Sequence, residues 1–209
     1  FLSKSIEDPR VITRLQYKSR TAFSDNLQSH VFIANLVNGQ LQQITFGNAY
    51  EHSITWSPAG DLIAFVSNRN TETDKFNNTD LFTVNVITGQ LQQLTNTKGC
   101  EWTPFFSPDG NDIAFTATQR ELTTIDSVAE DTHAFIISKL GGEVRELNQS
   151  QDRRVFMIRW SHDGNFLLFT ASDHGKILLY QATRLGSVRQ LFDYEAQISS
   201  FSVASNGAL

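Results

Sequence analysis

The sequence predicts an all-β fold: a β-propeller of four-stranded antiparallel blades, incomplete, with about four blades and the start of a fifth. Two short motifs alternate along the 209 residues, and they return at intervals of 43 to 54 residues. No segment shows a convincing 3.6-residue apolar period. A tandem unit of this length with four short strands has the size of one propeller blade. A β-sandwich is the alternative, but it would not repeat its turn sequence in phase.

The first motif is a turn followed by a polar strand. It reads "NGQLQQIT" at 38–45 and "TGQLQQLT" at 88–95, with weaker copies "GGEVRELN" at 141–148 and "GSVRQLF" at 186–192. Its glutamines suit a strand with one face in solvent. We therefore expect this motif to form the outer strand of each blade.

The second motif is a strand, a tight turn and a second, apolar strand. It reads "ITWSPAGDLIAF" at 54–65, "PFFSPDGNDIAF" at 104–115 and "IRWSHDGNFLLF" at 158–169, and a further copy begins with "FSVASNGAL" at 201–209. Proline and glycine favour a tight turn between the two strands. The motif therefore predicts the inner hairpin of each blade.

Large aromatic residues repeat within this inner hairpin. Trp56 has counterparts at Phe106 and Trp160, and we expect all three to be buried anchors between neighbouring blades. The next strand should hold their partners, Phe65, Phe115 and Phe169. Aromatic residues at repeating positions form a core far more often than a ligand site.

The two motifs place the blades at about 10–50, 51–101, 102–155 and 156–197, with the start of a further blade at 198–209. The first blade lacks the Ser-Pro-Asp-Gly turn. An incomplete ring leaves uncovered apolar faces on its first and last blades. On the last blade the candidates are Phe166, Leu168 and Ile177–Leu179, so self-association through this open side is an expected interaction.

Composition excludes several classes of protein. The chain is 40% apolar and 19% charged with a net charge of −5, as in an ordinary globular domain. This acidic balance argues against a nucleic-acid or anionic-membrane surface. No stretch approaches the roughly 18 apolar residues of a membrane span. A single cysteine, Cys100, excludes an internal disulfide. The compartment stays open, with the cytoplasm slightly favoured over the periplasm.

No catalytic residue, cofactor-binding residue or metal ligand is predicted. The sequence has no Gly-x-Ser-x-Gly nucleophile motif and no glycine-rich phosphate loop. His162 and His174 flank one hairpin, and we interpret them as surface histidines. The "DGND" segment at 109–112 resembles a calcium loop faintly, but it lies where every repeat needs a turn.

Contact surfaces and modification sites are expected in the loops. The two long loops at 68–80 and 118–133 are candidates for contact surfaces, because loops on a rigid scaffold carry function. Asn77 and Asn148 fit the glycosylation pattern, which matters only in a secreted eukaryotic protein.

The repeats resemble those of two groups of proteins. The units "WSPAGDLIAFVSNRN" and "FFSPDGNDIAF" are similar to the Asp-Gly propeller repeats of the prolyl oligopeptidase family, especially its acylaminoacyl peptidase and dipeptidyl peptidase branch. They also resemble the periplasmic propeller protein of the Tol system. Unequal loops, and the segment "DRRVFMIRWSHDGNFLLFTASDHGKILLY" with its basic pair, favour the peptidases. The eroded "SHDG" and "SNG" turns depart from the pattern.

The resemblance implies a serine peptidase as the parent protein. Its propeller would gate the access of peptide substrates to a C-terminal α/β-hydrolase domain, and no part of that domain is present in this sequence. The family's paired substrate-binding glutamates have no recognisable match here. A stand-alone Tol-type propeller that acts as a protein-binding scaffold is the alternative. A third possibility is an enzyme or lectin with its site in the propeller channel.

Overall fold

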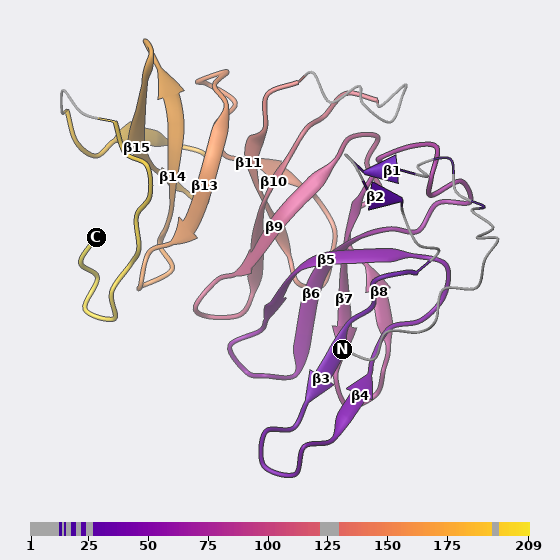
Figure 1. Ribbon diagram of the computed structural model, residues 1–209. Coiled ribbons are helices and arrows are strands. Elements are labelled where there is room, and N and C mark those ends of the chain that lie inside the picture. Colours follow the sequence, from indigo (N-terminus) through magenta and orange to yellow (C-terminus); the bar gives the residue numbers. More distant parts are fainter. Residues whose placement is uncertain are drawn as a thin grey trace.

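The computed structural model describes residues 13, 15, 18–19, 22–23, 27–121, 130–193 and 197–209. All regular secondary structure in these residues is strand, in antiparallel sheets that follow one another along the chain (Figure 1). None of these residues belongs to a helix with the length and apolarity of a membrane span. Three complete blades, part of a preceding one and the first segment of a following one form the incomplete propeller that the sequence predicts.

Each complete blade is a meander of four antiparallel strands, from the inner to the outer strand. The second blade consists of β5 (Tyr50–Trp56), β6 (Leu62–Asn68), β7 (Asp80–Asn85) and β8 (Leu91–Gln93). The third consists of β9 (Glu101–Phe106), β10 (Asp112–Ala117), β11 (His133–Ser138) and β12 (Arg145–Glu146). The fourth consists of β13 (Val155–Trp160), β14 (Phe166–Asp173), β15 (Lys176–Thr183) and β16 (Val188–Gln190).

Two separate strand pairs precede the second blade. β3 (Phe32–Ala34) pairs with β4 (Leu41–Gln43), and β1 (Lys18–Ser19) pairs with β2 (Ala22–Phe23). The repeated "LQQ" letters form β4 and β8, which are outer strands with mostly exposed side chains. The element recurs because the outer strand of a blade borders solvent and therefore carries polar side chains.

The second motif forms the same turn in each complete blade. In the second blade, Gly60 N donates to Ser57 O (3.0 Å) and Ser57 N donates to Leu62 O (2.9 Å). Gly60, Gly110 and Gly164 have φ between 68° and 72°, a region that glycine enters without the penalty of a Cβ atom. The repeated glycine is therefore required by the backbone of the turn.

The core lies in the seams, by which we mean the contacts between neighbouring blades. In the seam between the second and third blades, Ala64, Val66 and Leu81 pack against Phe106, Ile113 and Phe115. In the next seam, Ala114, Ala134 and Ile136 pack against Trp160, Leu167 and Phe169. A face of small and aliphatic side chains thus receives the aromatic face of the blade that follows.

The predicted aromatic partners are confirmed as core residues. Each of them stacks on an aromatic ring opposite it on the third strand of its own blade, with ring centroids 5.6 to 5.8 Å apart. The pairs are Phe65–Phe82, Phe115–Phe135 and Phe169–Tyr180. Such stacked pairs add to the stability gained by burial alone.

The expectation that Trp56 is a buried anchor is wrong. Phe106 and Trp160 are 8% and 7% exposed, whereas Trp56 is 48% exposed. An aromatic residue at this position faces the preceding blade, and Trp160 Nε1 donates to Phe105 O on β9 (3.0 Å). For Trp56, the described residues supply only the short pairs β1–β2 and β3–β4 on that side. The inner strand that would cover its ring is not among them.

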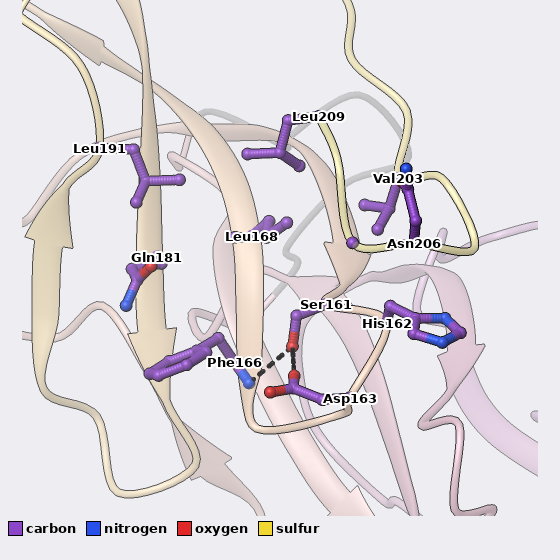
Figure 2. Close-up of a pocket in the computed structure, with 11 residues that line it drawn as sticks. Ser161, His162, Asp163, Phe166, Leu168, Gln181, Leu191, Val203, Asn206 and Leu209 are labelled. Atoms are coloured by element: carbon purple, nitrogen blue, oxygen red, sulfur yellow. Dashed lines mark hydrogen bonds between the residues drawn. The ribbon is translucent and has the colours of Figure 1, made fainter.

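The C-terminal segment, residues 197–209, lies against the fourth blade (Figures 1 and 2). Ile198 N donates to Ile177 O (2.9 Å), and the segment ends in a turn in which Gly207 N donates to Ala204 O (2.9 Å). This placement corrects the expectation of an uncovered face on the last blade. Leu168 is only 4% exposed and lines a cavity together with Val203.

The other apolar residues expected on that open side differ in their surroundings. Leu179 is buried at 2% exposure, and Leu178 is buried in the seam with the third blade. Phe166 and Ile177 are partly buried. None of the four is left on an open apolar face.

Candidate functional site

The two ends of the blades differ in regularity. At one end, which we call the turn end, the short turns between the first and second strands and between the third and fourth strands repeat from blade to blade. At the other, the loop-bearing end, the connections between the second and third strands cover residues 69–79, 118–132 and 174–175. Irregular loops on a rigid scaffold are where binding residues concentrate. The loop-bearing end is therefore the place to look for a site.

The loop at 69–79 has a fixed structure. Asn68 Nδ2 donates to the carbonyl oxygens of Thr73 (3.1 Å) and Phe76 (2.7 Å). Asn78 Nδ2 donates to Thr97 O (3.0 Å) and Gly99 O (2.6 Å), which belong to the connection into the third blade. The loop is thus tied to its own blade at one side and to the next blade at the other.

A cavity of about 470 Å³ lies at the loop-bearing end between the third and fourth blades. Its walls come from the first two strands of the third blade, from the start of the fourth blade and from the residues that precede β11. The residues lining it are Trp102, Thr103, Thr116, Glu130, Asp131, Thr132, Arg154, Val155 and Phe156. We refer to this as the inter-blade cavity.

Bulges in the inner strands shape the cavity. Thr103 has a φ of 49°, in the left-handed region, and the pairing of β9 with β10 shifts register beside it. Ser53 holds the same place in β5, with a φ of 54°. In β13 the register shifts around Phe156, whose side chain is left about half exposed. Bulges re-aim side chains next to functional sites, and here they direct Thr103 and Phe156 toward the cavity.

Charged groups of both signs surround the cavity. Glu130 Oε2 accepts hydrogen bonds from the backbone N–H groups of Gln119 (2.9 Å) and Arg120 (2.6 Å). The guanidinium of Arg154 lies 5.4 Å from the centroid of the Phe156 ring, within the range of a cation–π contact. The cavity thus offers carboxylates, a guanidinium and aromatic surface to a ligand.

The lining residues present groups that suit the binding of a ligand. Two of the described lining residues with hydroxyl groups, Thr103 and Thr116, face each other across the first and second strands of the third blade. Thr103 Oγ1 and Thr116 Oγ1 lie 3.1 Å apart and hydrogen-bond with each other. Polar and aromatic groups that converge in this way orient a ligand.

A second cavity, of about 360 Å³, lies between the fourth blade and the C-terminal segment (Figure 2). It is lined by the consecutive residues Ser161, His162 and Asp163. Ser161 Oγ donates to Asp163 Oδ1 (2.6 Å) and accepts from Phe166 N (3.0 Å), while the His162 ring points away from both (Figure 2). These are the contacts of the repeated turn, because Ser107 and Asp109 form the same pair in the third blade. The three residues do not form a catalytic triad.

His162 and His174 lie far apart, and the carboxylates of the "DGND" turn already have a partner. His162 lies at the turn end of β14 and His174 at its loop-bearing end, and both are exposed. Asp109 and Asp112 both bind the guanidinium of Arg184. In the described part of the chain, no three His, Cys, Asp or Glu side chains come together as metal ligands.

The two glycosylation sequences have different surroundings. Asn148 is fully buried, and its Oδ1 accepts a hydrogen bond from Ala134 N (2.8 Å). Asn77 is exposed in the loop at 69–79. Only Asn77 is therefore accessible to a modifying enzyme in the folded protein.

Sequence reasoning pointed to this end of the molecule without finding the cavity. The loop at 118–133 was a candidate contact surface, and it supplies Glu130, Asp131 and Thr132. The basic pair ahead of the strand, Arg153 and Arg154, was noted only as part of a resemblance. Arg153 forms an ion pair with Asp173, and Arg154 reaches the cavity. The bulges at Thr103 and Phe156 were not predicted, because a β-bulge has no fixed sequence signature.

No protein-family model and no curated protein matches the sequence. Solved structures do match it. TolB from Acinetobacter baumannii is 21% identical, with a TM-score of 0.56 over 84% of this chain and 40% of that one. A puromycin-hydrolyzing peptidase of Mycobacterium tuberculosis is 13% identical, with a TM-score of 0.67 over 88% of this chain and 32% of that one. Dipeptidyl peptidase 4 of Porphyromonas gingivalis is 12% identical, with a TM-score of 0.61 and the same coverage.

These likenesses establish the propeller fold. Both groups that the repeats resemble, TolB-type propellers and prolyl-oligopeptidase-like peptidases, are among the structural neighbours. The chain spans less than half the length of each of the three proteins described.

Proposed function

We propose that this chain is the non-catalytic propeller portion of a prolyl-oligopeptidase-like serine peptidase. Its loop-bearing end would gate the access of peptides to a hydrolase domain outside the chain. The observation that carries the proposal is the contrast between the two ends of the blades. The turn end repeats one hydrogen-bonding pattern, whereas the loop-bearing end has three unequal connections and the inter-blade cavity.

Two further observations support this role. Peptides carry charges and side chains, and the described lining of the cavity presents a guanidinium, carboxylates and aromatic rings. The likeness to the mycobacterial puromycin-hydrolyzing peptidase has a TM-score of 0.67, against 0.56 for the Acinetobacter TolB. A filter needs binding groups, as in this cavity.

A protein-binding scaffold of the TolB type is the second candidate. It is favoured by sequence identity, which is 21% with the Acinetobacter TolB and 13% with the mycobacterial peptidase. Such a scaffold would use the same loop-bearing end to hold a protein partner.

Activity-based labelling separates the two candidates. The whole open reading frame that contains this chain is expressed next to the 209-residue chain, and both are treated with a fluorophosphonate probe and with peptide–chromophore substrates. The full-length protein should be labelled and should hydrolyse a substrate, whereas the 209-residue chain should do neither, because nucleophile, base and oxyanion hole lie elsewhere. A full-length protein that is neither labelled nor active would favour the scaffold. Hydrolysis by the 209-residue chain would contradict both.

The filter itself is tested by substitution at the cavity. In the active full-length protein, Phe156→Ala should shift the preference between short and long peptides, since it removes a half-exposed ring from the cavity wall. Leu140→Ala is the matched control, an exposed apolar residue in a turn at the opposite end. Equal selectivity in the Phe156→Ala variant and the control would exclude the inter-blade cavity as the filter.

A further inference from the structure

Two glutamates occupy equivalent buried positions at the start of successive blades. Glu51 is the second residue of β5 and Glu101 the first residue of β9, each five residues before the anchor position of its blade. Each accepts a hydrogen bond from a threonine that follows the outer strand of the preceding blade, Thr45 for Glu51 and Thr95 for Glu101 (2.6 Å). Both glutamates therefore link two blades across a seam.

The two threonines also close the blade to which they belong. Thr45 Oγ1 accepts from Val31 N (2.8 Å), and Thr95 Oγ1 accepts from Leu81 N (2.8 Å). Each threonine hydroxyl therefore accepts a hydrogen bond from its own blade and donates one to the glutamate of the next blade. The hydrogen bond between threonine and glutamate is a repeated device of the seams.

The charge of Glu51 is compensated. Its carboxylate forms an ion pair with Arg69 and lies 3.4 Å from His30 Nδ1. It also accepts a hydrogen bond from Val31 N (3.2 Å). A guanidinium partner of this kind offsets part of the cost of burying a carboxylate.

Glu101 has no such compensation. The position of Arg69 is taken in the third blade by Gln119, whose side chain donates to Glu146 instead (2.7 Å). Glu101 is fully buried, and within the described residues its Oε1 has no hydrogen-bond partner. The hydroxyl of Thr97 lies close enough to Glu101 to lower the pKa of its carboxyl, and within the described residues the distance and angle criteria give this buried oxygen no hydrogen-bond partner.

The titratable groups that face Glu101 do not supply a positive charge. Asp80, at the start of β7, adds repulsion, and burial raises the pKa of its own carboxyl. Cys100 is the neighbour in the chain, and burial raises the pKa of its thiol to about 11. Burial raises the pKa of Glu101 to about 8, against the smaller lowering effect of the Thr95 hydrogen bond. Ionised Glu101 would be an unpaired buried charge.

We propose that Glu101 carries a proton in the folded protein at neutral pH, and that the seam between the second and third blades loosens when this proton is lost. The proton on Oε1 would be donated to the hydroxyl of Thr97, so that both orphaned atoms gain a partner. The neutral acid would keep its hydrogen bond with Thr95 at Oε2. In the preceding seam Glu51 forms an ion pair with Arg69, a contact that Glu101 lacks within the described residues.

The sign of the effect follows from proton linkage. Between the ordinary Glu pKa of 4.5 and the folded value of about 8, the folded state binds one proton more than the unfolded state. Stability from this group is complete below the lower value and falls as pH rises, by about tenfold in the unfolding equilibrium constant per pH unit. Above about 8 the loss levels off.

Urea unfolding of the 209-residue chain at intervals from about pH 5 to about pH 9 tests the proposal, because the linkage slope is read directly. The wild type should lose stability as the pH rises, and Glu101→Gln, a neutral shape-matched variant, should lose much less. Gln119→Arg places the missing guanidinium and should also reduce the loss. An alkaline loss in Glu101→Gln equal to that of the wild type would overturn the proposal.

A direct reading of the proton does not depend on how the variants fold. Infrared spectra of the wild-type chain in its folded state should contain a protonated-carboxyl C=O band at neutral pH, and this band should vanish at alkaline pH. If no protonated carboxyl is present near pH 7, the proposal is excluded, since ordinary Glu and Asp side chains are ionised there.

Discussion

At the scale of single residues, equivalent letters in the repeats do not have equivalent surroundings. Trp56 and Trp160 hold the same place in their blades, yet the first is half exposed and the second is buried. Glu51 and Glu101 also correspond, yet only the first has a cationic partner. The repeat determines the position of a side chain within its blade. The residues of the neighbouring blade determine which contacts that side chain makes.

The two tryptophans should therefore differ in their contribution to stability. Trp160→Ala should cost about 3–5 kcal/mol, because it removes a large buried ring and its hydrogen bond to Phe105 O. Trp56→Ala should cost roughly 1–2 kcal/mol, because only part of the ring is removed from water. Urea unfolding monitored by circular dichroism measures both. Equal losses of stability would mean that the first blade covers Trp56 in solution.

Sequence reasoning could predict the periodic aromatic residues but not the exposure of Trp56. The second strand of each blade lies between the first and third strands, and its apolar run in the sequence indicates this interior position. This strand holds Phe65, Phe115 and Phe169. Trp56 lies on an inner strand, where burial depends on a separate blade. That blade lacks the repeated turn, so the pattern gave no information about the contact.

At the scale of the blade, Arg184 connects two turns at the turn end. Its guanidinium binds Asp109 and Asp112 in the third blade, and its Nε donates to Gly164 O (3.0 Å) in its own blade. It also lies 5.0 Å from the centroid of the Trp160 ring. In the preceding seam, Lys139 takes the same position beside Asp61. In both seams a basic residue after the third strand thus lies beside the turn of the preceding blade.

Arg184→Ala should destabilise the chain by about 1–2 kcal/mol, and the loss should shrink in high salt. The ion pairs are partly exposed and contribute little each, while the contact with Trp160 and the packed stem add to them. Urea unfolding at low and high ionic strength provides the measurement. Arg189→Ala, in the exposed strand β16, serves as the control and should change stability by less than about 0.5 kcal/mol.

The sequence predicted a turn at 109–112 but could not predict its partner. Asp109 and Asp112 lie more than 70 residues before Arg184, and only the stacking of the blades brings them together. The same limit applies to the inter-blade cavity, whose walls come from two blades and a loop. Its shape also depends on bulges at Thr103 and Phe156, and a bulge is a backbone event without a fixed sequence mark.

At the scale of the whole molecule, each blade is stabilised by the blade that covers it. The described seams show one rule twice: a face of small and aliphatic residues is closed by the aromatic face of the next blade. On the fourth blade the C-terminal segment takes the place of that aromatic face. Leu168, Val203 and Leu209 line the cavity that remains between them (Figure 2).

The C-terminal segment should therefore control the solution behaviour of the chain. A chain that ends at Asp193 should expose Leu168 and Leu179, which are 4% and 2% exposed when residues 197–209 are present. An uncovered apolar sheet face should bind a hydrophobic dye and promote association of copies. Light scattering and dye fluorescence compare this truncated chain with the 209-residue chain at equal concentration.

A substitution that keeps the full length separates covering from chain length. Val203→Asp places a charge against the apolar wall at Leu168 and should raise dye binding toward the level of the truncated chain, because the segment can no longer pack there. Ser205→Asp, at an exposed position in the neighbouring turn, should leave dye binding unchanged. If the truncated chain is a monodisperse monomer that binds no dye, the C-terminal segment is not what protects this face. The fourth blade would then be stable without a cover, which the packing of the two inner seams argues against.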